Sequence, residues 1–272
     1  MKTLDLKIPT EWNQLSQKEI LYVCRLFFLN LTGQKFKLLL FLKLTGVKAL
    51  PNKIVADNIF YIFRKNNIRF SLSVDELHWF LKSTDFLTTD SKLTKNVFPR
   101  FRIFWKRFFG PSNKCYNITF LEFLNIESCI YAFHKTRENK HLDQLCAIMY
   151  RRQKKEYRPN SPDYNGDRRE PFNDYTYTRR ASWFKLLPLV KKYAVYVFYI
   201  GCRNALMKAH PNLFSSTPVN SEPVNPIENL KKIMYSLNQG DITKNKQIQH
   251  TQIWEAFGQL EEMVNQSKPK KG

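Results

Sequence analysis

The recurrence of apolar residues at helical spacing constrains the fold of this chain more than any other feature. The clearest example is a set of residues spaced three and four positions apart, as one face of an α-helix requires: Leu142, Leu145, Cys146, Met149 and Tyr150. The apolar run 193–202 follows Pro188, which suits the first turn of a helix, and we expect that helix to continue to about Ala209. These patterns predict two core helices that pack against each other.

A highly charged segment separates the two predicted helices. Residues 151–180 hold nine basic and five acidic residues together with three prolines. An active-site loop, a nucleic-acid clamp and a partner-docking loop are the alternatives. Because the segment contains no recognisable catalytic set, we expect an ordered docking loop that Phe172 holds to the body, with Arg168, Arg169 and Phe172 as partner-binding residues.

Helix-start signals and a turn signal predict further elements. Capping boxes, in which Ser or Thr is followed three residues later by Glu, begin helices after Ser16, Ser73 and Thr119. Apolar and polar residues alternate beside Asn66 and Asn67, which predicts a β-hairpin near 59–73. The sequence therefore predicts a mainly α fold, a multi-helix bundle-like domain with one small β-hairpin and a linked C-terminal helical tail.

The predicted helical body covers residues 1–214. Residues 215–226 hold three prolines and no apolar periodicity, so we expect a linker there, followed by a helical tail over 227–272. A tail of about 40 residues rarely has a core of its own. We hypothesise that the tail packs on the body and offers a partner helix one apolar face; a permanently docked tail is the alternative. The partner-binding residues on that face are Trp254, Phe257 and Leu260.

A basic and aromatic stretch gives a second functional hypothesis. Residues 92–114 hold seven basic residues and no acidic one, with phenylalanines and a tryptophan between them. Cations that bind phosphates and aromatic rings that stack on bases are the two components of single-strand recognition. The alternative is an amphipathic helix with buried aromatic residues. The nucleic-acid-binding candidates are Arg100, Arg102, Trp105, Lys106 and Arg107.

The formal charge of +21 favours a polyanion, an acidic protein or a membrane surface as partner.

The five cysteines are scattered and form no C-x-x-C, so we expect buried, reduced thiols in a cytosolic protein. The stretches 20–45 and 193–202 are too polar or too short to span a membrane, and the N-terminus lacks the apolar segment of a signal peptide.

Catalytic motifs are absent from the sequence. There is no P-loop, G-x-G-x-x-G or G-x-S-x-G. His134 and Arg137 have the H-x-x-R spacing of tyrosine recombinases, with Arg203 as the second arginine, but the order is reversed and no suitably spaced tyrosine follows. Three carboxylates of the charged segment could hold Mg²⁺, although the arginines between them favour internal pairing: Asp163, Asp167 and Glu170. We predict no enzyme activity, no metal site and no cofactor.

Several segments together resemble a known group of proteins. They are "NITFLEFLNIESCIYAFHKT", "HLDQLCAIMYRR", "DRREPF", "AVYVFYIGCRNAL" and "GDITKNKQIQHTQIWEAFGQLEEM". They resemble uncharacterised tail-module proteins of phages and prophages from Bacteroidetes hosts. The resemblance implies a helical, non-enzymatic tail-assembly factor in the host cytoplasm, similar to the chaperones that hold a tape-measure protein. A nucleic-acid-binding accessory protein that uses the stretch 92–114 is the alternative.

Overall fold

The protein is described from a computed structural model that covers residues 6–29, 31, 33–55, 58–160, 166–214, 241 and 244–267. The chain forms two compact units, Met1–Lys92 and Leu93–Gly272. The predicted body, 1–214, therefore includes the whole of the first unit and part of the second. The predicted linker, 215–226, and the beginning of the predicted tail lie outside the described residues.

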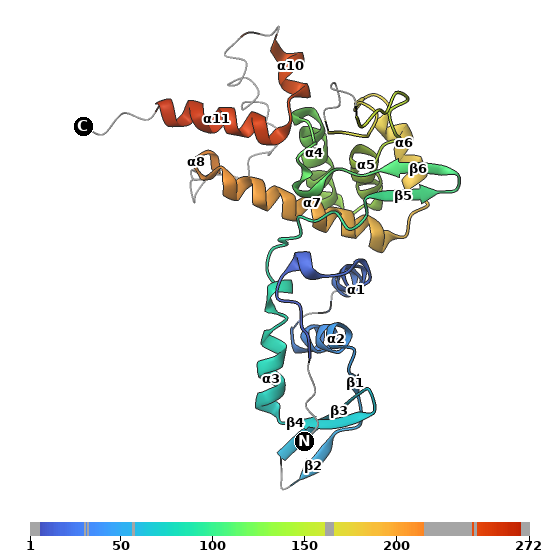
Figure 1. Cartoon of the computed structure of the whole chain (residues 1–272), viewed down its shortest axis with the longest axis vertical. Helices are drawn as coiled ribbons and strands as arrows, with labels where there is room; N and C mark the ends of the chain where they lie inside the picture. The colour runs from blue at the N-terminus through green and yellow to red at the C-terminus, as the bar shows by residue number, and fades with distance from the viewer. Residues whose placement is uncertain are drawn as a thin grey trace, which may run out of the picture. The chain divides into compact units, whose positions relative to one another are not determined.

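The first unit combines helices with a small antiparallel sheet (Figure 1). Its elements are η1 (Trp12–Gln14), α1 (Gln17–Phe28), α2 (Gly33–Thr45), β1 (Lys48–Ala49), β2 (Lys53–Val55), β3 (Asn58–Lys65), β4 (Ile68–Leu72), α3 (Val74–Lys82) and η2 (Asp85–Leu87). Strand β3 pairs antiparallel with each of the other three strands. The core between the sheet and the helices contains Phe41, Val47, Phe63, Leu72, Leu77 and Leu81.

Local sequence signals explain how the elements of the first unit begin and turn. The side chains of Ser16 and Ser73 each accept a hydrogen bond from the main chain three residues later, and the reciprocal Glu contacts are present, so both predicted capping boxes are confirmed. Asn66 and Asn67 have φ values of 47° and 65°, the left-handed conformation that a tight hairpin turn requires and that asparagine tolerates. The predicted hairpin is therefore present as β3 and β4.

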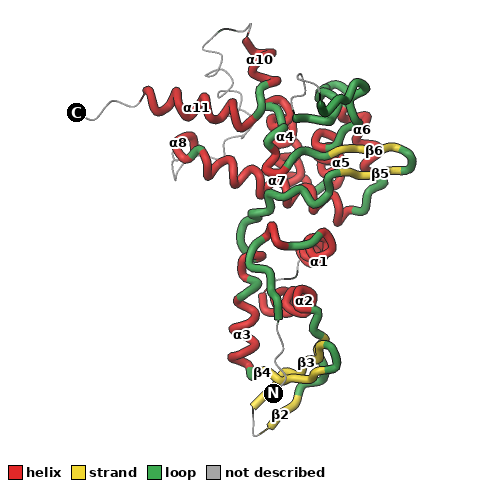
Figure 2. The backbone as a smooth tube through the Cα atoms, viewed as in Figure 1, coloured by secondary structure: helices red, strands yellow, loops and turns green. Residues whose placement is uncertain are grey.

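The second unit is a helical body with a projecting β-hairpin (Figure 2). Its elements are β5 (Arg100–Ile103), β6 (Lys106–Phe109), η3 (Asn113–Cys115), α4 (Phe120–Thr136), α5 (Asn139–Met149), α6 (Tyr177–Phe184), α7 (Leu189–Ala209), α8 (Pro211–Phe214), α10 (Asn245–His250) and α11 (Ile253–Ser267). The two predicted core helices are confirmed as α5 and α7, which pack together, and Pro188 is the N-cap of α7.

The predicted fold class, mainly α with a single hairpin, is wrong. The described residues form helices together with two antiparallel sheets of four and two strands, so the fold is mixed α/β. Strands β1 and β2 are two and three residues long, too short to display a clear alternation in the sequence. Strands β5 and β6 replace the amphipathic helix that was the alternative for 92–114, because Phe101 and Ile103 alternate with Arg100 and Arg102 at a period of two.

Among the described residues, no helix is long and apolar enough to cross a membrane. The longest helix that the structure describes, α7, has 21 residues, but it includes Lys191, Lys192, Arg203 and Lys208. The ammonium group of Lys192 is buried and lies 2.6 Å from Asp143 Oδ1 on α5, so α7 contributes an internal ion pair as well as apolar surface to the core.

Candidate nucleic-acid interface

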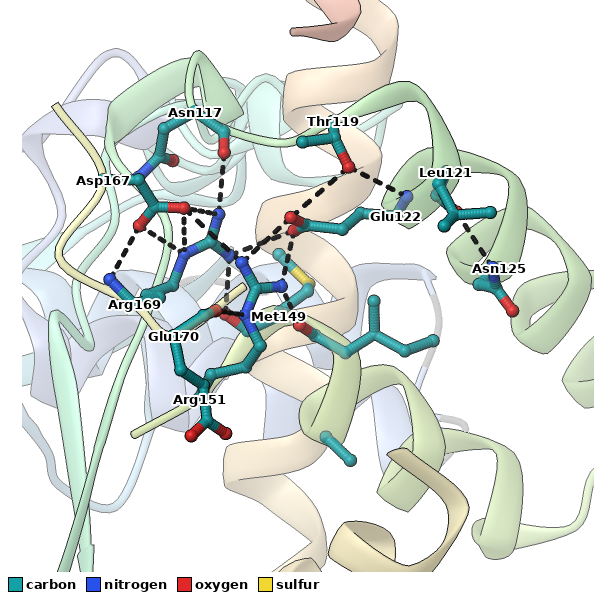
Figure 3. A network of polar contacts seen from close by, with 12 residues as sticks. Asn117, Thr119, Leu121, Glu122, Asn125, Met149, Arg151, Asp167, Arg169 and Glu170 are labelled. Carbon is teal, nitrogen blue, oxygen red and sulfur yellow. Dashed lines mark hydrogen bonds and ion pairs between the residues drawn. The ribbon is translucent and has the colours of Figure 1, made fainter. Parts of the chain in front are cut away.

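A buried network of two arginines and two carboxylates attaches the charged segment to the helical body (Figure 3). Arg151 and Arg169 are each 1% exposed, and Glu122 on α4 is also 1% exposed, so none of these charges is solvated by bulk water. Asp167 completes the set, which balances two positive and two negative charges. Burial of charges on this scale is tolerable only because the opposite charges pair with one another.

The geometry of the network satisfies both guanidinium groups. Arg151 Nη2 donates to Glu122 Oε1 at 2.9 Å, and Nη1 lies 2.9 Å from Glu122 Oε2. Arg169 Nε and Nη2 donate to the carboxylate of Asp167 at 2.9 and 2.8 Å. Further N–H groups of the two arginines donate to the main-chain carbonyls of Ile148, Glu170, Met149 and Asn117. The charged segment is therefore clamped to α4 and to the end of α5.

The electrostatics of the network keep Asp167 and Arg169 ionised. Burial raises the pKa of the Asp167 carboxyl, but the Arg169 charge and its hydrogen bonds outweigh this effect and hold the pKa below its ordinary value of 3.8. Burial lowers the pKa of Arg169, yet the charges of Glu122 and Asp167 outweigh it and raise that pKa. Both residues therefore stay charged and paired at neutral pH.

The clamped segment extends the β5–β6 hairpin. Arg151 exchanges two main-chain hydrogen bonds with Phe109 on β6, at 2.7 and 3.1 Å. Lys154 donates in turn to the carbonyl of Arg168 at 3.1 Å. As a result the guanidinium of Arg168 lies 4.0 Å from the centre of the Phe109 ring, a stacked cation–π arrangement.

The hairpin has one buried face and one cationic face. Phe101 pairs with Phe108 across the two strands, and both side chains are buried. The neighbouring pair, Arg102 opposite Arg107, is exposed on the other face. Arg100 shares that face because it lies two residues from Arg102.

These three arginines and Arg168 form what we call the arginine face: Arg100, Arg102, Arg107 and Arg168. Within the described part of the chain, no carboxylate lies within ion-pair distance of any of them. Arg100 and Arg168 border a hollow of about 400 Å³ that Phe109 and Asn117 also line. The face therefore offers several fixed cations around an aromatic ring.

The tip of the hairpin is aromatic and exposed. Phe104 and Trp105 are 62% and 75% exposed, and their ring centroids lie 5.8 Å apart. Figure 1 shows this tip extending away from the helical body of the second unit. Phe104 has a φ of 52°, so the turn holds a non-glycine residue in the left-handed region. Exposed rings at a strained turn are unusual for a surface without a partner.

The hairpin carries all five residues predicted for nucleic-acid binding, but on two different sides. Arg100, Arg102 and Arg107 lie on the arginine face and Trp105 at the tip. Lys106 lies on the opposite side, where its Nζ atom is 3.3 Å from the centre of the Trp183 ring. Sequence reasoning missed the contribution of Trp183, which comes from α6, far away along the chain.

The residues predicted for partner binding are distributed differently. Phe257 and Leu260 on α11 are buried, and the Phe257 ring lies 5.6 Å from that of Phe123 on α4. Trp254 is half-buried, and its Nε1 donates to the carbonyl of Lys114 at 2.9 Å. In the charged segment, Phe172 is buried, as expected of the residue that holds it to the body. Of its two candidate arginines, Arg168 is exposed and Arg169 is buried.

The other polar candidates are engaged in internal contacts. Asp167 binds Arg169, while Glu170 Oε1 lies 2.9 Å from Arg180 Nη2; Asp163 lies outside the described residues. His134 Nε2 lies 2.9 Å from the hydroxyl of Tyr196, and Arg203 Nε lies 3.0 Å from Glu127 Oε1. In the described ranges, no group of three or more His, Cys, Asp or Glu side chains is arranged to hold a metal ion.

Comparison with known proteins gives no family for this chain: no protein-family model, no curated protein and no solved structure matches it.

Proposed function

We propose that the second unit binds single-stranded nucleic acid through the β5–β6 hairpin. The contact surface consists of the arginine face and the aromatic tip. The arginines contact phosphates, and Phe104 and Trp105 stack on unpaired bases, which is the division of labour in sequence-tolerant single-strand binding. A charge of +21 for the whole chain adds long-range attraction to such a partner.

The observation that carries the proposal is the pairing of Arg102 with Arg107. Like charges directly opposite each other on neighbouring strands destabilise a hairpin. Arg100 and Arg168 add two more cations to the same surface, and no described carboxylate compensates any of them. A row of phosphates would relieve this repulsion, and guanidinium groups are well suited to phosphate oxygens.

The state of the buried acids supports a role in binding rather than in catalysis. Glu127 accepts a hydrogen bond from the Tyr199 hydroxyl at 2.7 Å and lies 3.0 Å from Arg203 Nε. Glu122 and Asp167 are occupied by Arg151 and Arg169 in the same way. These carboxylates stabilise the fold, and we propose that the protein is not an enzyme.

The proposal is tested by titrating a fluorescently labelled oligothymidylate at several salt concentrations. For single strands, log K falls with log salt at a slope of roughly −0.7 per neutralised phosphate. Replacing Arg102 and Arg107 by Gln is expected to weaken binding and to reduce the magnitude of the slope by about 1.4. Trp105→Ala is expected to weaken binding by about 1–3 kcal/mol per lost base stack with the slope unchanged.

The matched control replaces two exposed cations elsewhere in the second unit. Lys135→Gln on α4 combined with Lys208→Gln on α7 removes the same formal charge as the hairpin variant, and neither residue belongs to the hairpin or to the charged segment. The control is expected to retain most of the affinity and slope. Equal losses in both double variants would mean that only net charge matters, and the hairpin would not be the binding surface.

A second candidate is the tail-assembly factor that the sequence resemblance implies. It is favoured by the way α11 docks, because only one face is buried while Trp254 stays half-exposed at its edge. A helical partner such as a tape-measure protein could contact Trp254, although access to Phe257 and Leu260 would require α11 to move. The host cytoplasm is the proposed location for either function.

Two variants test partner capture. Trp254→Ala leaves the buried side of α11 intact, and deletion of residues 215–272 removes the whole tail. Loss of capture of a tape-measure protein, in variants that remain folded, supports the tail-assembly role. Unchanged capture in both variants contradicts a role for the tail.

A further inference from the structure

A second basic cavity lies on the other side of the hairpin from the arginine face. It has a volume of about 670 Å³ and is formed by β6, the charged segment and α6. Phe108 lines this cavity, whereas its neighbour Phe109 lines the hollow beside Arg168. Successive residues of a strand point to opposite faces, so the two depressions lie on opposite sides of β6.

The cavity contains three cationic side chains, of which Lys106 also contacts the Trp183 ring. Lys106, Arg152 and Arg179 line it, and among the described residues none of them lies within ion-pair distance of a carboxylate. The charge of Arg152 also acts on Lys106: burial first, and then that charge, lower the pKa of the lysine. The cations therefore repel one another in the free protein, and a bound anion would remove the repulsion.

The wall of the cavity is fixed by internal contacts. Arg180 donates to the carbonyl of Ala147 at 3.0 Å and pairs with Glu170 at 2.9 Å, so the acid in the wall is already neutralised. Glu170 in turn donates its main-chain N–H to the carbonyl of Arg152 at 2.8 Å. A site whose rear wall is held in this way loses little conformational entropy on binding.

The cavity also contains the indole ring of Trp183, one face of which Lys106 covers. The ring of Trp183 lies beneath the Lys106 ammonium group at 3.3 Å, and it faces the Trp105 ring edge-on at a centroid distance of 6.4 Å. Cations and an indole in one concave site are suited to a ligand that carries a phosphate and a ring together. A nucleotide has both.

We propose that the cavity lined by Lys106, Arg152, Arg179 and Trp183 is a binding site for a nucleotide phosphate. The cations bind a terminal phosphate group, and Trp183 contacts the attached base. The phosphate belongs either to a free mononucleotide or to the 5′ end of a strand held by the hairpin. The second source rests on the proposed single-strand binding, whereas the first does not.

The test measures two kinds of ligand on the full-length protein. In one arm, AMP and inorganic phosphate are titrated by calorimetry. In the other, 5′-phosphorylated and 5′-hydroxyl oligothymidylates of equal length are compared by fluorescence anisotropy. We expect AMP to bind, or the 5′-phosphate to raise affinity about tenfold, since charge-assisted hydrogen bonds to phosphate are among the stronger polar contacts.

Variants assign the effect to the cavity. Arg152→Gln combined with Arg179→Gln is expected to abolish AMP binding and the 5′-phosphate preference, while affinity for the 5′-hydroxyl strand is largely kept. Both side chains are exposed, so the fold should survive, and Lys135→Gln combined with Lys208→Gln is the control that removes the same formal charge elsewhere. The variant Arg102→Gln with Arg107→Gln should leave AMP binding intact, which separates this site from the arginine face.

The outcomes distinguish the two proposals. AMP binding that depends on Arg152 and Arg179, without any binding of oligonucleotides, supports the cavity and contradicts the hairpin function. A 5′-phosphate preference without AMP binding supports the strand end as the source. Absence of both AMP binding and a 5′-phosphate preference, or effects that persist in the Arg152 and Arg179 variant, would overturn the proposed site.

Discussion

Arg151 and Glu122 form a buried, two-point ion pair, with both terminal nitrogens of the guanidinium 2.9 Å from the two carboxylate oxygens. Both side chains are 1% exposed, and Arg169 also lies 3.3 Å from Glu122 through its Nη1 atom. The single carboxylate of Glu122 therefore faces two buried cations. Its position on α4 makes it the point at which the charged segment is fastened to the helical body.

Removing that carboxylate is expected to destabilise the second unit strongly. Glu122→Ala leaves only Asp167 to balance the buried charges of Arg151 and Arg169. Removing one partner of a buried ion pair lowers the free energy of unfolding by about 3–5 kcal/mol. Urea unfolding followed by circular dichroism measures the loss. Glu138→Ala is the control, because Glu138 pairs with Lys140 at 2.6 Å on the surface, where solvent screens the interaction. Similar losses in both variants would contradict the importance of the network.

Gly201 on α7 is expected to tolerate no side chain. A Cβ atom at this position would overlap the main chain of Leu93, since the nitrogen of Leu93 would lie only 2.6 Å away. Gly201→Ala is therefore expected to lower the melting temperature, although alanine normally favours a helix over glycine by about 1 kcal/mol. Gly258→Ala on α11 is the matched control, because nothing lies within 4 Å of its Cβ position. The control is expected to stabilise the protein slightly.

Acid is expected to destabilise the second unit through Asp167. The folded-state pKa of this carboxyl lies below its ordinary value of 3.8, so its contribution to stability is complete above that value and is lost as the pH falls through the lowered pKa. Urea midpoints measured from about pH 5 to about pH 2 should fall. Asp167→Asn is expected to be less stable at neutral pH and to show a shallower decline. A decline as steep as in the unmodified protein would contradict this assignment.

The sequence predicts the helices far better than the strands. The spacing of apolar residues in α5 and the capping signals at Ser16 and Ser73 act within a few residues of each other, so they can be read locally. Of the capping box predicted at Thr119, only one of the two hydrogen bonds is present. Thr119 accepts from the N–H of Glu122 as predicted, but the Glu122 carboxylate is recruited by two distant arginines. Tertiary pairing overrides the local motif there.

The candidate site is predictable only in part, for the same reason. The five hairpin candidates are close together in the sequence, and their chemistry indicates nucleic-acid binding without knowledge of the fold: Arg100, Arg102, Trp105, Lys106 and Arg107. Their arrangement was not predicted, because the adjacent Phe108 and Phe109 of β6 break the period of two that β5 shows. Trp183 and Arg179 reach the cavity through α6, and no local pattern connects α6 with β6.

Cysteine labelling gives a last test, which follows the two units separately. All five cysteines are buried and unbridged, and burial raises the pKa of Cys24 and of Cys129 to about 12. Native protein is therefore expected to resist thiol reagents at neutral pH, because burial blocks access to all five and keeps Cys24 and Cys129 in the unreactive thiol form. A Ser71→Cys variant, exposed on β4, should react at once and shows that the reagent is active.

The same reagent reports which unit opens first. Cys24 lies in the first unit, and the other four lie in the second: Cys115, Cys129, Cys146 and Cys202. In Glu122→Ala protein at low urea, we expect those four to react while Cys24 stays protected, because the lost network belongs to the second unit alone. Mass spectrometry of the labelled peptides separates the sites. Simultaneous labelling of all five would show that the two units unfold as one cooperative body.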